Sequence, residues 1–139
     1  MFVFNMENTL QMEINKISII FPKCFISNSN ELILDPKQNI YFLLYDVKTV
    51  LDFKCKFIAY VSRYACKGST LKKQALVREK FNRYLGTHFS EEDILYYIYT
   101  KLGCDANREL CKKFVESNYD LSVISNSIEY TPIAEGEIK

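Results

Sequence analysis

The chain has 139 residues, a formal net charge of +1 and a hydrophobic content of 48%. This size suits one compact domain with its own apolar core, so the fold needs no disulfides or metal to be stable. The uncharged apolar runs are much shorter than the roughly 20 residues of a membrane helix, and residues 1–6 lack the basic and apolar regions of a signal peptide. We therefore expect a cytoplasmic protein without membrane contact.

The first 45 residues are predicted to form strands. Residues 13–21 alternate in character, with Ile17, Ile19 and Phe21 on one face. Shorter extended segments follow, separated by polar or proline-containing turns. We expect a three- or four-stranded antiparallel sheet drawn from residues 13–21, 24–27, 31–35 and 39–45, with residues 2–5 as a candidate further edge strand.

After residue 45 the apolar spacing changes from two to about 3.6, which is typical of helices. Gly68, Gly86 and Gly103 each follow an apolar periodic segment and are predicted to end a helix. Ser90 and Asp93 have the spacing of a capping box. The expected helices cover residues 46–66, 70–85, 90–102 and 106–117.

The expected fold class is therefore α+β, with a small N-terminal antiparallel sheet followed by about four helices. We predict a single domain over residues 1–124, with strands within 2–45 and helices within 46–118. Residues 121–124 are interpreted as a last strand. Residues 125–139 are polar and acidic and are predicted to be a loose tail.

The chain has five cysteines and a single histidine, His88, and it shows no pair of cysteines at CxxC spacing. Metal-binding cysteines and histidines occur in close clusters, which this sequence lacks. We therefore expect no metal or cofactor. In a reducing compartment the thiols are expected to be reduced and mostly buried: Cys24, Cys55, Cys66, Cys104 and Cys111.

The distribution of charge is the strongest functional feature. Residues 54–83 contain nine basic residues and a single acid, whereas both flanking segments are net acidic. Lys56, Tyr60, Arg63 and Lys67 are spaced by four, three and four residues, so they lie on one stripe of a helix. On the next helix, further cations lie away from the apolar side: Lys72, Lys73, Lys80 and Arg83.

Basic side chains with an interleaved aromatic ring suit a phosphate backbone, because each neutralised phosphate releases counterions. The sequence therefore predicts that this helix pair binds nucleic acid or a nucleic-acid-handling complex. The alternative is that the cations are solvated or pair with acids of the same chain.

A tyrosine-rich segment, residues 90–102, is the second candidate surface. Tyr96, Tyr97 and Tyr99 lie among aliphatic residues, and so many large side chains cannot all face one core. Exposed tyrosine near acidic residues is typical of protein interfaces, so this helix is predicted to bind a protein partner or a second copy of the chain. The alternative is a helix that is buried on all sides.

Asp35, Asp46 and Lys48 are the third candidate group. Two carboxylates and a lysine at the ends of neighbouring strands can hold Mg²⁺ and orient water. This pattern is similar in outline to the restriction-endonuclease-type site, which implies a Mg²⁺-dependent nuclease, although the glutamate that such sites prefer is absent. Turn and helix-capping roles for these residues are the favoured interpretation.

The sequence thus favours a non-enzymatic cytoplasmic binding protein whose partner is nucleic acid or a nucleoprotein complex. Frequent Ile, Asn, Lys and Tyr with scarce Gly and Ala are typical of an AT-rich genome. A small chain without catalytic motifs also suits a phage or mobile-element inhibitor that occludes a host defence machine. The alternatives are a protein–protein adaptor, a subunit of a homo-oligomer and, more remotely, the nuclease.

Overall fold

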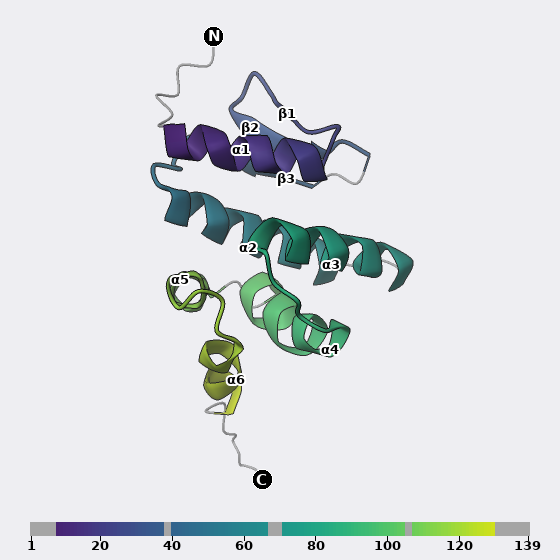
Figure 1. Ribbon diagram of the computed structural model, residues 1–139, viewed down its shortest axis with the longest axis vertical. Coiled ribbons are helices and arrows are strands. Elements are labelled where there is room, and N and C mark those ends of the chain that lie inside the picture. The colour runs from purple at the N-terminus through teal and green to yellow at the C-terminus, as the bar shows by residue number, and fades with distance from the viewer. Residues whose placement is uncertain (1–7, 38–39, 67–70, 105–106, 130–139) are drawn as a thin grey trace.

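The computed structural model describes residues 8–37, 40–66, 71–104 and 107–129, and Figure 1 shows its arrangement. Its architecture is α+β, as predicted, with a three-stranded antiparallel sheet on the N-terminal side. The elements in chain order are α1 (Asn8–Ile20), β1 (Phe25–Ile26), β2 (Glu31–Asp35), β3 (Ile40–Leu43), α2 (Val50–Cys66), α3 (Leu71–Leu85), α4 (Glu91–Asp93), the π-helix η1 (Ile94–Cys104), α5 (Arg108–Glu116) and α6 (Leu121–Glu129).

The sheet follows the alternation of the sequence. Its strand order is β1-β2-β3, with Leu32 opposite Phe42 and Ile33 opposite Tyr41. Leu32, Leu34 and Phe42 are fully buried, while the side chains between them face outward. The three strands predicted over residues 24–45 are therefore confirmed. The further strand predicted at residues 2–5 lies outside the described residues.

Residues 13–21 do not form a strand, and this prediction was wrong. They belong to the helix α1, which buries one helical face through Leu10, Ile14, Ile17 and Ile20. The alternation of Ile17 and Ile19 was misleading, because Ile19 is exposed. The isoleucines of this segment favour a strand as β-branched residues. A helix forms instead, because it buries apolar side chains that recur every three or four residues on one face.

Residues 121–124 are also helical rather than extended. They open α6, in which Ile124 is fully buried and Asp120 accepts hydrogen bonds at the helix start from the Ser122 backbone N–H (3.0 Å) and hydroxyl (2.8 Å). An aspartate in this position stabilises a helix N-terminus. The predicted tail is helical up to Glu129, and residues 130–139 lie outside the described part of the chain.

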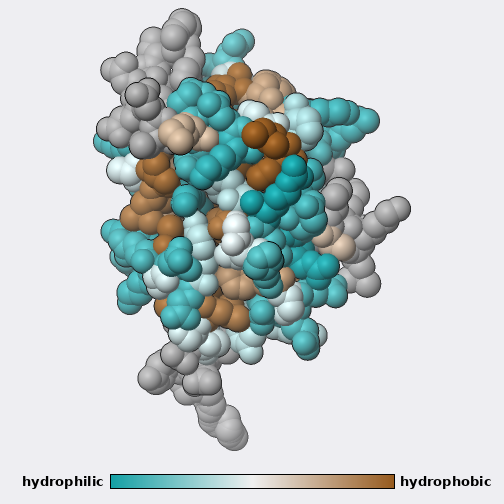
Figure 2. Space-filling view, viewed as in Figure 1, coloured by the Kyte–Doolittle hydropathy of each residue, from teal (hydrophilic) through white to brown (hydrophobic). Residues whose placement is uncertain are grey.

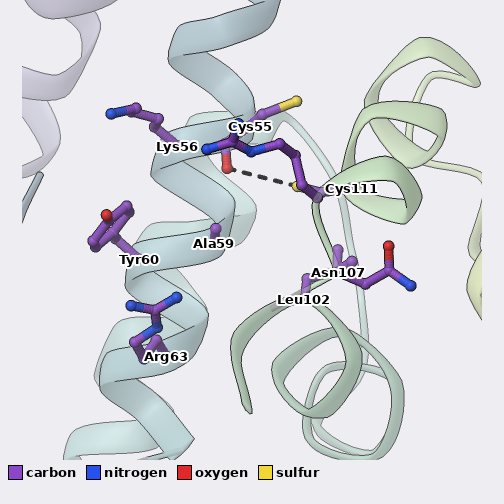
Figure 3. A pocket seen from close by; sticks show the side chains of 9 residues that line it. Cys55, Lys56, Ala59, Tyr60, Arg63, Leu102, Asn107 and Cys111 are labelled. Carbon is purple, nitrogen blue, oxygen red and sulfur yellow. Dashed lines mark hydrogen bonds between the residues drawn. The ribbon is translucent and has the colours of Figure 1, made fainter. Parts of the chain in front are cut away.

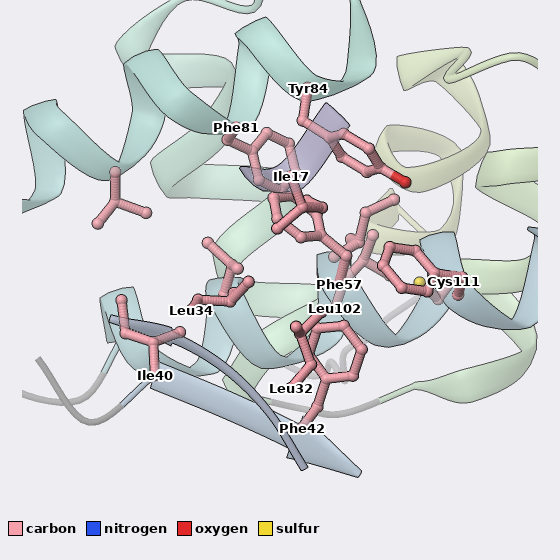
Figure 4. Close-up of a cluster of buried hydrophobic side chains, with 14 of the residues drawn as sticks. Ile17, Leu32, Leu34, Ile40, Phe42, Phe57, Phe81, Tyr84, Leu102 and Cys111 are labelled. Carbon is pink, nitrogen blue, oxygen red and sulfur yellow. The ribbon is translucent and has the colours of Figure 1, made fainter. Parts of the chain in front are cut away.

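The elements form three layers around α2, as Figure 1 shows. The sheet and α1 lie on one side of α2 and α3, and η1, α5 and α6 lie on the other. Figure 4 shows side chains from the sheet, α1, α2 and α3 meeting in one apolar cluster, in which the Phe57 and Tyr84 rings are 4.5 Å apart. A buried hydrogen bond also joins α1 to α3, since the Tyr84 hydroxyl donates to Glu13 Oε1 at 2.6 Å.

The predicted capping box is confirmed at the start of α4. The Asp93 N–H donates to Ser90 Oγ at 3.1 Å, and the Ser90 N–H donates to Asp93 Oδ2 at 3.4 Å. The chain then continues into η1, whose wider turns let the Thr100 hydroxyl donate to the Leu95 carbonyl five residues earlier. Gly86 ends α3 with a positive φ of 72°, as its position predicted.

Gly103 has a different role from the predicted helix stop. It lies within η1, at the place where this helix crosses α2. A Cβ atom at position 103 would lie 2.5 Å from the Ser62 carbonyl carbon and 2.6 Å from the Arg63 backbone nitrogen. The two helices can therefore approach this closely only because residue 103 has no side chain. On the α2 side, Ser62 is a small residue and is fully buried.

We expect Gly103→Ala to destabilise the fold by about 3 kcal/mol, since the backbones of α2 and η1 must separate to accommodate the methyl group. Gly86→Ala is the matched control: its Cβ meets open space, so it costs only the ~1 kcal/mol of a left-handed conformation. Urea unfolding of both variants measures the difference.

Ser62→Ala is the complementary variant at the same crossing. The Ser62 hydroxyl is buried without a hydrogen-bond partner among the described residues. Removing it is expected to leave stability unchanged or to raise it by up to about 1 kcal/mol. Equal losses in Gly103→Ala and Gly86→Ala would contradict the close-crossing interpretation.

Candidate nucleic-acid interface

The helix α2 carries the predicted binding stripe, and a capping box fixes its start. The Asp52 N–H donates to Thr49 Oγ1 at 3.0 Å, while Asp52 Oδ2 accepts from the N–H groups of Lys48 (3.0 Å) and Thr49 (3.1 Å). Burial favours the neutral carboxyl, but these hydrogen bonds and the charge of Lys112 outweigh it and hold the pKa of Asp52 below its usual value. The orphan N–H groups at this helix end are thereby satisfied.

The apolar side of α2 faces the core through Phe53, Phe57, Ile58 and Val61, as the sequence pattern predicted. The predicted stripe therefore lies on another side of the helix. In Figure 3, Lys56, Tyr60 and Arg63 project from α2, while Leu102, Asn107 and Cys111 come from the elements opposite.

These residues line one pocket, which we call the α2–α5 pocket. Its lining comprises Cys55, Lys56, Ala59, Tyr60, Arg63, Leu102, Asn107, Arg108 and Cys111, and its volume is about 160 Å³. Three of these side chains are cationic at neutral pH, namely Lys56, Arg63 and Arg108, and none is acidic. A concave site with this lining is suited to an anion such as a phosphate group.

Two arginines provide the accessible charge of the pocket. Arg108 is exposed at the first position of α5, and Arg63 is half-buried on α2. No carboxylate of a described residue lies within ion-pair distance of either guanidinium. Arg63 lies over the Tyr60 ring, with its Cζ 5.1 Å from the ring centroid, so Tyr60 holds the guanidinium in place.

Lys56 is less available than its position on the stripe predicted. Its Nζ pairs with Asp46 Oδ1 at 2.6 Å and donates to the Leu43 carbonyl at 3.2 Å, and its side chain is only 16% exposed. Asp46 thus offsets part of the positive charge at one end of the pocket. The alternative interpretation, in which a cation pairs with an acid of the same chain, therefore holds for Lys56.

The cations of α3 do not extend the pocket. Lys80 donates to the Ile20 carbonyl at the end of α1 at 2.7 Å and lies 5.0 Å from the Phe21 ring centroid. Arg83 is exposed and borders a separate hollow with Arg78 and His88. Lys67 and the side chains of Lys72 and Lys73 lie outside what the structure describes.

The three tyrosines of η1 have different environments. Tyr96 is 66% exposed and Tyr97 is half-buried, whereas Tyr99 is 2% exposed and packs against Phe81. The prediction that some of these rings reach the surface is right for Tyr96. Tyr99 is a core residue, so it is not available to a partner in this fold.

The carboxylates of the nuclease-like pattern have local partners. Asp35 Oδ1 accepts from the Lys37 N–H at 3.0 Å, which stabilises the turn after β2, and Asp46 pairs with Lys56. Within the described ranges, no group of three or more His, Cys, Asp or Glu side chains is placed to hold a metal ion.

Sequence reasoning did not identify Arg108 and Asn107 as part of the site. The Asn107 side chain caps α5 by accepting from the Leu110 N–H at 3.0 Å, and the Asn107 N–H donates to the Lys101 carbonyl of η1 at 3.3 Å. These bonds fix the start of α5, whose first residue, Arg108, lines the pocket together with Arg63. The Asn before a helical segment is a recognisable cap signal, but the helix that it faces depends on the tertiary fold.

On the side shown in Figure 2, hydrophobic residues occur in separate groups among hydrophilic ones. None of the described helices has a stretch that is long and apolar enough to cross a bilayer. Comparisons with protein-family models, curated proteins and solved structures gave no match for this chain. The α2–α5 pocket is therefore the feature from which a function can be proposed.

Asp52 gives a pH-dependent test of how α2 is anchored. Because its pKa is lower in the folded state, its contribution to stability is present above the unfolded-state pKa near 3.8 and is lost as the pH falls through the folded value. We expect Asp52→Asn to be about 1 kcal/mol less stable than the parent at pH 7, with the gap narrowing below about pH 4.

Urea unfolding at pH 7, 5, 4 and 3 measures this effect. Glu92→Gln, which changes an exposed acid on another helix, is the control and is expected to match the parent at each pH. A stability gap for Asp52→Asn that stays constant down to pH 3 would contradict the ionic role of the cap.

Proposed function

We propose that the protein is a non-enzymatic cytoplasmic binding protein that contacts nucleic acid, or a complex that handles nucleic acid, through the α2–α5 pocket. One observation carries the proposal: Lys56 and Arg63 from α2 and Arg108 from α5 line a single hollow that has no acidic side chain in its lining. Two helices that are far apart in sequence thus contribute charge of the same sign to one place.

The chemistry of these residues supports a phosphate-containing partner. A guanidinium offers a planar fork of N–H donors that matches phosphate oxygens in pairs, and burial of that contact releases counterions from a polyanion. Tyr60 adds an aromatic surface beside Arg63, against which a base can stack when the strand is single. The pocket is too small for a duplex, so we assign it one backbone phosphate and place the rest of the contact on the surrounding surface.

The same surface suits an inhibitor that occludes a nucleoprotein machine, because occlusion needs complementary charge but no reacting groups. The composition typical of an AT-rich genome is compatible with a phage or mobile-element origin. In this version of the proposal the pocket receives a phosphate, or an acidic side chain that takes its place, on the partner complex.

A protein adaptor is the second candidate function, and Tyr96 favours it. Its ring is 66% exposed on η1, one turn from the exposed acids Glu91 and Glu92. Exposed tyrosine beside charge is typical of protein interfaces. This surface is separate from the α2–α5 pocket, so variants at the two places distinguish the two functions.

Fluorescence anisotropy with labelled duplex DNA, single-stranded DNA and RNA, at several salt concentrations, tests the proposal. The parent protein is expected to bind at least one of these, with an affinity that falls steeply with salt. Arg63→Ala and Arg108→Ala are each expected to weaken binding by about tenfold and to reduce the slope of log affinity against log salt by about one.

Lys113→Ala is the matched control, since it removes one positive charge from an exposed position on α5 that does not line the pocket. It is expected to change affinity by less than about twofold. An affinity that is equal for Arg108→Ala and Lys113→Ala would contradict a role for the pocket. Nucleic-acid binding lost in Tyr96→Ala instead would place that binding on η1, and no nucleic-acid binding by the parent protein at low salt would favour the adaptor.

Asp46→Asn is a gain-of-function variant for the same site. It removes the carboxylate that pairs with Lys56, so one more uncompensated cation faces the ligand. Nucleic-acid affinity is expected to rise by about threefold to fivefold at low salt, with the gain disappearing in the double variant Asp46→Asn/Lys56→Ala. Unchanged affinity in Asp46→Asn would place Lys56 outside the binding surface.

A further inference from the structure

The α2–α5 pocket also contains two thiols that the proposed function does not use. Cys55 on α2 is half-buried and lines both this pocket and the neighbouring hollow, whereas Cys111 on α5 is 2% exposed. The Cys111 Sγ donates to the Cys55 backbone carbonyl at 3.6 Å, as the dashed line in Figure 3 shows. Cys55 is therefore open to small solutes, and the buried Cys111 sulfur lies beside the Cys55 backbone.

The surroundings make these two thiols chemically different. The neighbouring Cys111 thiol lowers the pKa of Cys55, and Lys112 adds to this effect, while burial and the charges of Asp52 and Glu116 oppose it. The proximity of Cys55 and burial raise the pKa of Cys111 well above its ordinary value. Cys55 thus ionises first, and Cys111 keeps its proton.

A thiolate that small molecules can reach, next to a second protonated thiol, is the arrangement of a nucleophilic and a resolving cysteine. The cations Lys56 and Arg108 line the same pocket. Helices α2 and α5 pack directly against each other, and the Cys111 sulfur lies beside the backbone of Cys55, so a bond between the two sulfurs joins neighbouring elements.

We propose that Cys55 and Cys111 form a redox-active pair, in which Cys55 reacts with hydrogen peroxide and Cys111 resolves the product to an intramolecular disulfide. This inference does not depend on the binding of nucleic acid. In the first step the Cys55 thiolate attacks one peroxide oxygen, the O–O bond breaks, and Cys55 becomes a sulfenic acid as hydroxide leaves.

In the second step the sulfur of Cys111 attacks the sulfur of the sulfenic acid. The S–O bond breaks, the S–S bond forms, and the Cys111 proton leaves with the hydroxide as water. In sum, two thiols and one peroxide give one disulfide and two waters, so the two electrons lost by sulfur reduce the peroxide. Two molecules of a cellular thiol such as glutathione reduce the disulfide by exchange and are themselves oxidised to glutathione disulfide.

Cys24 provides an internal reference within the same molecule. It is also half-buried, but its sulfur lies 3.5 Å from the Ser18 hydroxyl and has no second thiol beside it in the described part of the chain. It is therefore expected to react as an ordinary thiol.

The test treats the native full-length protein with hydrogen peroxide at pH 7, blocks the remaining thiols by alkylation and maps the peptides by mass spectrometry. We expect the peptides of Cys55 and Cys111 to be joined, with a loss of two hydrogens, about tenfold faster than Cys24 is oxidised. Treatment with glutathione is expected to restore both thiols. Cys24→Ser is expected to leave the rate of cross-linking unchanged.

Cys111→Ser is expected to stop the reaction at the sulfenic acid, which dimedone traps on Cys55. Because a change at a buried position can impair folding, the alkylation rate of the unmodified protein by iodoacetamide, measured from pH 5 to 9, gives an independent readout. The rate for Cys55 is expected to rise at lower pH than the rate for Cys24.

Two results would overturn the proposal. One is oxidation of Cys55 no faster than that of Cys24 in the native protein. The other is a set of disulfides distributed among all cysteines, including Cys66 and Cys104, rather than a predominant bond between Cys55 and Cys111. The effect of Arg108→Ala on nucleic-acid binding tests only the proposed function. The binding proposal and the redox proposal can therefore be refuted independently.

Discussion

The crossing of α2 and η1 is the contact on which the rest of the structure depends. Helix α2 is the middle element of the fold, and it receives the sheet and α1 on one side and η1 with α5 on the other. The absence of a side chain at Gly103 lets η1 lie directly on the α2 backbone. The hydrogen bond from the Asn107 N–H to the Lys101 carbonyl then sets α5 against η1. Through this chain of contacts the close approach at Gly103 helps to position α5, and with it Arg108, against α2.

The basic segment serves the fold as well as the surface. Lys80 binds the last carbonyl of α1, where the partial negative charge of the helix dipole lies, and Lys56 ties α2 to the residues that follow β3. Arg78 pairs loosely with Glu91, at 3.8 Å. The net charge of this segment is therefore a poor measure of its binding capacity. Arg63 and Arg108 carry the proposed function because neither forms an ion pair with a carboxylate in the described part of the chain.

The sequence pattern predicted some elements well and others poorly, for physical reasons. Strands β2 and β3 alternate along their length because one face of the sheet is buried, so their pattern was clear. In α1 and α6 the short apolar runs fit a strand as well as a helix, and the tertiary packing of Ile17 and Ile124 decided the outcome. The part of the candidate site on α2 is predictable from helical spacing, because Lys56, Tyr60 and Arg63 are four and three residues apart. Arg108 and Cys111 belong to it only because α5 folds back onto α2, and no local pattern reports such a contact.

The small residues at the crossing also bear on how this protein can diverge. Substitutions at Arg63 or Arg108 change a solvent-facing pocket and leave the packing of the helices intact. Ser62 and Gly103 have no such freedom, because each is enclosed by the backbone of the opposite helix. A lineage that descends from this chain can therefore exchange its ligand quickly while it retains two small residues at these positions. Small residues at both positions are therefore expected to be conserved in descendants for longer than any residue of the binding surface.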